Sequence, residues 1–238
     1  MYKKYAIDLS YFNDHVVAAL TAHYGEGLTI HYHYGQYLIF SLPAACDKVI
    51  RINFTGAKLY PAIGDAWTGT SVITNPKELQ VNQYATTVSM TLVLGSSFIL
   101  FIGDNGSDPF IVLFGKLTNS ECFAICSTVS THPTYLSWRK SMLTDGNLCG
   151  FFPMAMGIDA THPDDYLIKI PVMIVNYANK LLINTDGSPA TLPGMFFTPA
   201  ASSIYNSNKI CLRTGVHCYT DSARYGNYAL PLLVELTP

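Results

Sequence analysis

The sequence predicts a mainly β protein with an antiparallel β-sandwich or barrel-like core and a small N-terminal α+β region. Three observations predict this class. Four apolar runs follow one another between residues 88 and 129, one segment at residues 11–24 has a helical period, and further short apolar runs continue to the C-terminus. We therefore expect a helix and a β-hairpin in residues 1–60 and an antiparallel β domain in residues 61–238, or one continuous domain.

The first expected element is the helix at residues 11–24. Ser10 is the expected N-cap, Asp14 lies in the first turn, and Gly25 follows as a stop signal. One face carries an apolar stripe, formed by Phe12, Val16, Ala19, Leu20 and His23. We expect this stripe to pack on the sheet that follows.

A β-hairpin is expected after the helix. Residues 28–34 and 37–42 are runs rich in β-branched and aromatic side chains, and the Gly35-Gln36 pair between them has the length of a tight turn. Residues 48–54 alternate in the same way and should continue the sheet. The N-terminal region is therefore predicted to be α+β up to about residue 60.

Residues 61–84 are harder to assign. Gly64, Gly69 and Pro76 punctuate them, which is typical of a linker. Trp67 and the Val72-Ile73 pair nevertheless favour a strand within this segment, because aromatic and β-branched residues are enriched in strands.

The four apolar runs that follow predict a meander of four antiparallel strands. They are separated only by turn-forming residues and span residues 88–94, 98–102, 110–114 and 122–129. The longest turn contains Asn105-Gly106, which suits positive φ, and it is closed by Pro109.

The second and third runs are apolar on both faces of the predicted sheet. Phe98, Leu100 and Ile102 point one way while Ile99 and Phe101 point the other, and residues 110–114 repeat the pattern. An antiparallel sheet usually leaves one face in water. This hairpin therefore predicts a second layer on one side and another domain or subunit on the other.

The C-terminal half is expected to combine long loops with short strands. Residues 130–163 are rich in Pro, Gly, Asp and Thr, which favours loops with a short helix near residues 135–142. Pro171 lies inside a long strand-like run at 166–177, which indicates an edge position or a bulge. The remaining predicted strands are 180–184, 195–198, 209–213 and 230–236, with a turn at 185–188.

Composition excludes some functions. Charged residues make up 13% of the chain, the net charge is −2 and no Lys/Arg run occurs, which argues against direct nucleic-acid binding. No stretch is long and apolar enough for a membrane span, and Asp8 interrupts any leader-like run at the N-terminus. The cysteines, Cys46, Cys122, Cys126, Cys149, Cys211 and Cys218, are scattered, and buried reduced thiols are expected.

His31 and His33 are the candidate metal ligands. Two residues apart on a strand, both side chains should leave the same face, which is one way in which β-barrel metalloenzymes present two ligands. His15, His23, Asp65 and Glu78 are available as further ligands, but none has a metal-binding spacing. Structural histidines are therefore the favoured interpretation, and no metal or cofactor is predicted.

No catalytic motif is complete. Gly95-Ser-Ser-Phe98 lacks the second glycine of a nucleophile elbow, and Gly103–Asp108 lacks the final Glu of a calcium loop. Asp159, Asp164, Asp165 and Glu121 could supply paired carboxylates, but turn formation explains adjacent aspartates better. Exposed aromatics such as Trp67 and Trp138 could stack on sugars, although packing or subunit contact is the favoured role.

Several passages resemble structural proteins of tailed bacteriophage particles. They are residues 64–75, 92–117, 115–119 and 230–236. The resemblance implies a non-enzymatic virion component, made in the host cytoplasm without a leader and working as one copy of a ring or multimer. It brings no site motif with it.

These observations lead to one hypothesis and two alternatives. The hypothesis is a structural subunit of a phage virion, in the tail, neck or fibre, that contacts other virion proteins and forms a homo-oligomer. Its contact surfaces are expected in the loops at residues 130–163 and 195–208. The alternatives are a carbohydrate- or receptor-binding β module that meets a cell-surface glycan, and a metal-dependent β-barrel enzyme using His31 and His33.

Overall fold

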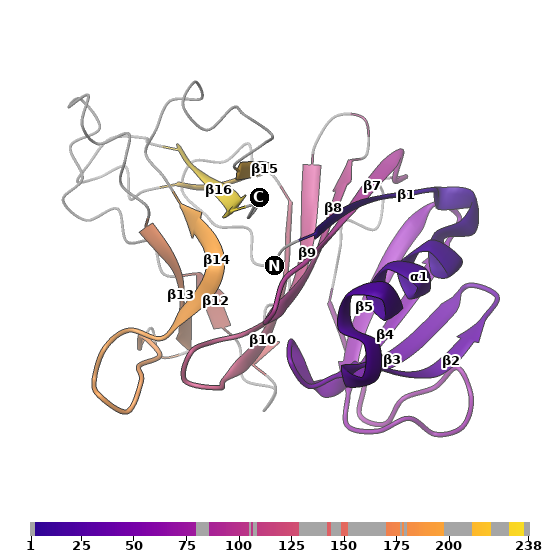
Figure 1. Cartoon of the computed structure of the whole chain (residues 1–238), viewed down its shortest axis with the longest axis horizontal. Helices are drawn as coiled ribbons and strands as arrows, with labels where there is room; N and C mark the ends of the chain where they lie inside the picture. The colour runs from indigo at the N-terminus through magenta and orange to yellow at the C-terminus, as the bar shows by residue number, and fades with distance from the viewer. Residues whose placement is uncertain are drawn as a thin grey trace.

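The computed structural model describes residues 3–79, 86–104, 106, 109–128, 142–143, 149–151, 170–176, 178, 180–197, 211–219 and 229–235. It shows a mainly β, antiparallel protein with one α-helix near the N-terminus, which confirms the predicted fold class. The described strands form three sheets that stack as layers in a sandwich-like arrangement (Figure 1).

The central sheet contains the predicted meander. Its strand order is β1-β7-β8-β9-β10-β11, and the pairs are antiparallel. The strands are β1 (Lys3–Ile7), β7 (Ser89–Leu94), β8 (Phe98–Asp104), β9 (Pro109–Lys116), β10 (Cys122–Thr128) and β11 (Met142–Leu143). Strand β1 was not expected, because a five-residue run that begins with two lysines gives a weak pattern.

The N-terminal sheet has the order β2-β3-β4-β5-β6. Its strands are β2 (Thr29–Tyr34), β3 (Tyr37–Leu42), β4 (Cys46–Thr55), β5 (Lys58–Gly64) and β6 (Lys77–Glu78). The predicted hairpin is confirmed, with Tyr34 opposite Tyr37 across the Gly35-Gln36 turn. The expected boundary at residue 60 lies inside β5, so this sheet continues into the segment 61–84, for which a linker and a strand were both considered.

The C-terminal sheet has the order β12-β13-β14-β16-β15. Its strands are β12 (Cys149–Phe151), β13 (Ile170–Asn176), β14 (Thr191–Phe197), β15 (Cys211–Tyr219) and β16 (Ala229–Glu235). The bulge expected at Pro171 is confirmed by a register shift between Pro171 and Val172. The expected strand at 180–184 makes only isolated bridges, at Leu181 and Ile183.

Most of the predicted loops lie outside the described residues. Of residues 130–163, the structure describes only β11 and β12, and of residues 195–208 only the end of β14. The helix expected at 135–142 also lies outside them, except for Met142, which begins β11. The role of these loops as contact surfaces therefore stays a prediction.

Both faces of the central hairpin are buried within this one chain. Ile99, Phe101, Val112 and Phe114 belong to a core shared with the N-terminal sheet and the helix. Phe98, Leu100, Ile111 and Leu113 belong to a second core shared with the C-terminal sheet. The predicted extra layer is confirmed as a third sheet of the same chain, so the hairpin needs no neighbouring subunit to cover it.

Helix α1 (Phe12–Tyr24) follows a 3₁₀ turn, η1 (Leu9–Tyr11), and ends in a second 3₁₀ turn, η2 (Gly25–Gly27). The expected N-cap Ser10 is wrong, because Tyr11 is the residue that precedes α1 and it makes no side-chain capping bond. Asp8 instead caps the η1 turn, where its Oδ1 accepts a hydrogen bond from the Ser10 N–H at 2.9 Å. The helix ends as predicted at Gly25, whose φ of 54° suits glycine.

Candidate functional site

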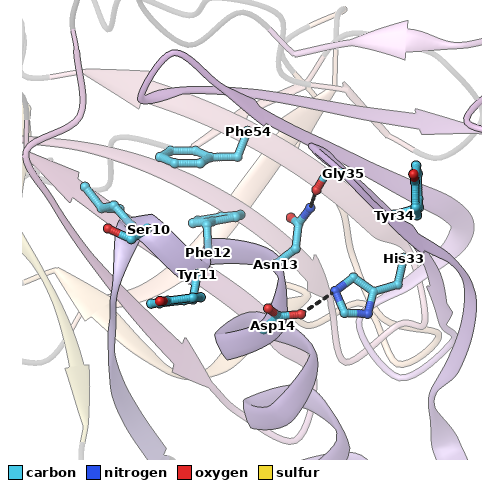
Figure 2. Close-up of a pocket in the computed structure, with 10 residues that line it drawn as sticks. Ser10, Tyr11, Phe12, Asn13, Asp14, His33, Tyr34, Gly35 and Phe54 are labelled. Atoms are coloured by element: carbon cyan, nitrogen blue, oxygen red, sulfur yellow. Dashed lines mark hydrogen bonds and ion pairs between the residues drawn. The ribbon is translucent and has the colours of Figure 1, made fainter.

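A cleft of about 320 Å³ opens where the start of α1 meets the turn between β2 and β3 (Figure 2). It draws residues from three parts of the N-terminal region, which the chain brings together only on folding. The lining residues are Leu9, Ser10, Tyr11, Phe12, Asn13, Asp14, His33, Tyr34, Gly35 and Phe54.

Two stacked phenylalanines form an apolar wall of the cleft. The rings of Phe12, from α1, and Phe54, from β4, lie with centroids 4.3 Å apart and planes at 17°. Phe12 is buried and also contacts Phe101 of the central sheet, with centroids 6.3 Å apart. This wall is fixed by the main hydrophobic core, so it gives the cleft a rigid base.

Asn13 is the buried polar residue of the cleft. It is 7% exposed, and its Nδ2 donates a hydrogen bond to the carbonyl of Gly35 at 2.9 Å. Its Oδ1 is buried and has no hydrogen-bond partner in the part of the chain that the structure describes. A buried acceptor left unpaired costs about 1–3 kcal/mol, so this atom is an unused binding group.

Asp14 and His33 form an ion pair at the same end of the cleft. The Nε2 atom of His33 lies 2.9 Å from Oδ1 of Asp14, and the carboxylate is the more exposed partner. Because a carboxylate only accepts, Nε2 must carry the hydrogen. The second carboxylate oxygen of Asp14 is therefore the acceptor that this pair leaves for a ligand.

The remaining polar groups stand around the rim. Tyr11 and Tyr34 are 61% and 76% exposed, and the Tyr11 ring stacks on His15 with centroids 6.3 Å apart. Figure 2 shows Ser10 across the cleft from His33. A hydroxyl nucleophile, an imidazole base and a carboxylate are therefore not assembled as a catalytic relay here.

The structure does not place His31 and His33 on one face of the sheet, and the predicted shared face is wrong. A β-bulge between Ile30 and Tyr32 interrupts the alternation of β2. His33 pairs with Leu38 and points toward α1, whereas His31 contacts Ser41 and Trp67 on the outer face, with Nε2 to Oγ at 2.8 Å and ring centroids at 5.5 Å.

Other predicted candidates are not brought together with the cleft. Within the described residues, no group of three or more His, Cys, Asp or Glu side chains could hold a metal ion. Glu121 immediately precedes β10, and its N–H donates to Asn119 Oδ1. The N–H of Gly106 donates to Asp104 in the turn after β8, as turn chemistry requires. Asp159, Asp164, Asp165 and Trp138 lie outside the described residues.

The described thiols are buried. Cys46, Cys122 and Cys126 are free cysteines and almost fully covered. Burial raises the pKa of Cys46 to about 12 and that of Cys122 to about 11. Since the thiolate is the nucleophile, burial disfavours the reactive form of these two thiols. The side chains of Cys149, Cys211 and Cys218 lie outside the described residues.

The cleft residues Asn13 and Asp14 were not singled out as a site from the sequence. One feature of the sequence could have identified Asn13. It lies three and seven residues before Val16 and Leu20, so it shares their face of the helix and places an amide on the apolar side. Among the described helices, none is long and apolar enough to cross a membrane.

Comparison of the chain with protein families, with curated proteins and with solved structures found no match. The fold and the cleft therefore define the class by themselves. It is a three-layered antiparallel β protein with one N-terminal helix and a small, mostly polar cleft at the start of that helix.

Proposed function

We propose that this chain is a non-enzymatic structural subunit of a phage virion, in the tail, neck or fibre, that acts through protein–protein contacts. Its partners are other virion proteins and further copies of itself. It would be assembled in the host cytoplasm and reside in the virion, without direct contact to nucleic acid. The resemblance of residues 64–75 and 92–117 to phage structural proteins is one support for this role.

The observation that carries the proposal is a surface poor in charge but with large apolar side chains exposed on different layers. Charged residues are 13% of the chain, about half the usual share. Val72, Val88 and Ile183 are 51%, 57% and 54% exposed, and they flank the N-terminal, central and C-terminal sheets respectively. A surface so poor in charge suits a subunit with neighbours on several sides, because charged residues are depleted at the cores of protein interfaces.

The test is the oligomeric state of the purified chain. Light scattering coupled to size exclusion should show one closed oligomer of fixed stoichiometry, or a fixed complex when other virion proteins are co-expressed. Val72, Val88 and Ile183 should each be replaced by Glu in a separate variant. At least one of the three variants should assemble less than the wild type while remaining folded. A chain that stays monomeric alone and beside its virion neighbours would refute the proposal.

A carbohydrate- or receptor-binding module is the second candidate, and the cleft at the start of α1 favours it. The cleft combines an unpaired amide oxygen, a carboxylate and exposed tyrosines, which are groups that bind polar ligands. The two functions are compatible, since a virion subunit can also meet a receptor.

A further inference from the structure

The unpaired oxygen of Asn13 indicates what kind of group the cleft receives. The bond from Nδ2 to Gly35 fixes the amide, so Oδ1 is turned away from the β2–β3 turn, toward the side of Phe12 (Figure 2). Oδ1 is therefore held in one position before any ligand binds, and as an amide oxygen it can only accept a hydrogen bond. Oδ1 is covered in this structure, so a ligand donor can reach it only if a neighbouring cleft side chain moves. Side-chain rotamer changes of this kind are common on binding.

The rest of the lining narrows the ligand class. No Lys or Arg lines the cleft, and its polar groups include the acceptors Asn13 Oδ1 and the second oxygen of Asp14. A phosphate or carboxylate ligand, which would bring only further acceptors, would meet no cation among these side chains other than a protonated His33. A ligand that brings hydrogen-bond donors therefore suits these acceptors better than an anion does, and the hydroxyls of Ser10, Tyr11 and Tyr34 can pair with its own acceptors.

The apolar part of the lining distinguishes between the two classes of ligand that bring donors, sugars and ammonium ions. Phe12 is buried and stacks on Phe54, so the carbon surface open to a ligand comes mainly from the exposed rings of Tyr11 and Tyr34 at the rim. A sugar ring has hydroxyl donors on its edge and a C–H face that packs on carbon. A simple ammonium would find a single carboxylate, one oxygen of which already accepts from His33. The volume of about 320 Å³ suits one or two sugar rings.

We infer that the cleft lined by Asn13, Asp14, His33, Phe12 and Phe54 is a saccharide-binding site, in which sugar hydroxyls donate to Asn13 Oδ1 and to the free oxygen of Asp14. This inference rests on the second candidate function and supplies its place and its ligand class. It does not depend on the virion role. His33 acts as a positioning residue, because its N–H holds the Asp14 carboxylate in one orientation.

The test is binding of methyl glycosides of glucose, galactose, mannose and N-acetylglucosamine to the full-length chain, followed by calorimetry and by ligand-detected NMR. At least one glycoside should bind with a dissociation constant of about 1 mM, near −4 kcal/mol. Asp14→Asn should weaken binding about tenfold, because a charged acceptor becomes a neutral one. Asp65→Asn changes a carboxylate outside the cleft and is the matched control, expected to bind as the wild type does.

Asn13→Leu is the second variant, and it should abolish binding while circular dichroism and the melting temperature report whether the helix still docks. Asp14→Asn keeps the inference testable if Asn13→Leu does not fold. Three outcomes would overturn the inference: no glycoside binds the wild type, Asp14→Asn and Asp65→Asn bind equally, or butylammonium displaces the sugar as well as a second sugar does. Light scattering on the same samples distinguishes the proposals, because a closed oligomer that binds no sugar supports the virion role alone.

Discussion

At the scale of single residues, two glycines in the central sheet are packing positions. Gly103 lies opposite Phe110 and Gly115 lies opposite Phe123, one pair facing each core. A Cβ on Gly115 would lie 2.8 Å from the Phe123 ring and 3.1 Å from Leu192 of the C-terminal sheet. Each phenylalanine therefore covers the glycine across from it, and the second pair also lets the two sheets approach closely.

We predict that Gly103→Ala destabilises the protein by about 1–3 kcal/mol, because the new methyl group would overlap the Phe110 ring inside a packed core. Urea unfolding measures the change. Gly27→Ala is the matched control, since nothing lies within 4 Å of its added Cβ and its φ is not positive. Equal stability of the two variants would show that Phe110 does not cover Gly103.

Asp65 provides a pH-dependent contribution to stability. Hydrogen bonds from Lys48 and then from Asn75 hold the pKa of this carboxyl below its ordinary value of 3.8. A lowered folded-state pKa stabilises the fold above the unfolded value, and this stabilisation is lost as the pH falls through the folded value.

Asp65→Asn should therefore be less stable than the wild type at pH 7, and the difference should shrink as the pH falls below about 3.8. Thermal melts across this pH range measure it. In a Lys48→Met background the same substitution should show a smaller pH dependence. A difference between wild type and Asp65→Asn that stays constant with pH would show that the carboxylate is not held as described.

The pair His31 and His33 shows where residue-level inference from sequence ends. The spacing of two predicts one shared face only if the strand is regular. The bulge at residue 31 adds one residue to β2, which turns His31 to the outer face while His33 keeps the inner face. Register shifts of this kind depend on the pairing with β3 and leave no mark in the sequence pattern.

At the scale of elements, α1 connects two sheets. Asn13 in its first turn bonds to Gly35 in the N-terminal sheet, and the Tyr24 hydroxyl at its other end lies 2.8 Å from the carbonyls of Gly95 and Phe98 in the β7–β8 turn. Burial raises the pKa of Tyr24 far above its ordinary value, so the hydroxyl stays a donor at any physiological pH.

We expect Tyr24→Phe to destabilise the protein by about 1 kcal/mol, because one buried hydrogen bond between the helix and the central sheet is lost. Tyr34→Phe is the control, since its ring is 76% exposed. Chemical denaturation of both variants gives the comparison. If Tyr24→Phe were as stable as Tyr34→Phe, the hydroxyl would not fasten the helix.

The helix boundaries illustrate what sequence predicts well and badly at this scale. Gly25 ends α1 as expected, because its positive φ is a local requirement that glycine meets. The start was misplaced by one residue, because the 3₁₀ turn capped by Asp8 occupies Leu9–Tyr11 and α1 begins only at Phe12. Strand β5 was missed because Pro61 and Gly64 suggested a linker, although the pairing of Pro61 with Ile52 accommodates the proline within the sheet.

At the scale of the whole molecule, the three-layer arrangement makes a testable prediction for β9. Leu113 and Phe114 are consecutive residues that face opposite cores. Leu113→Ala should cost about 2–5 kcal/mol and Phe114→Ala about 3–5 kcal/mol, because each opens a cavity in a packed layer. In a two-layered protein one of two consecutive strand residues would face solvent, and its replacement by Ala would cost little stability.

Equilibrium unfolding of the two variants measures these costs, and Tyr34→Ala on the exposed end of β2 is the control, expected within about 0.5 kcal/mol of the wild type. Where a truncation prevents folding, Ile111→Val and Val112→Ala probe the same two faces more gently. Destabilisation confined to one face would contradict the three-layer arrangement.

The sequence by itself determined the fold class, the helix predicted at residues 11–24, the meander and the need for cover on both faces of its hairpin. These follow from periodicity and turn chemistry, which act between residues close in the chain. Only the tertiary structure decided that the cover comes from the same chain, that a bulge separates His31 from His33, and that Asn13, Asp14 and His33 form one cleft. These depend on contacts between segments from tens to more than a hundred residues apart, whose register is set by packing and has no local signal.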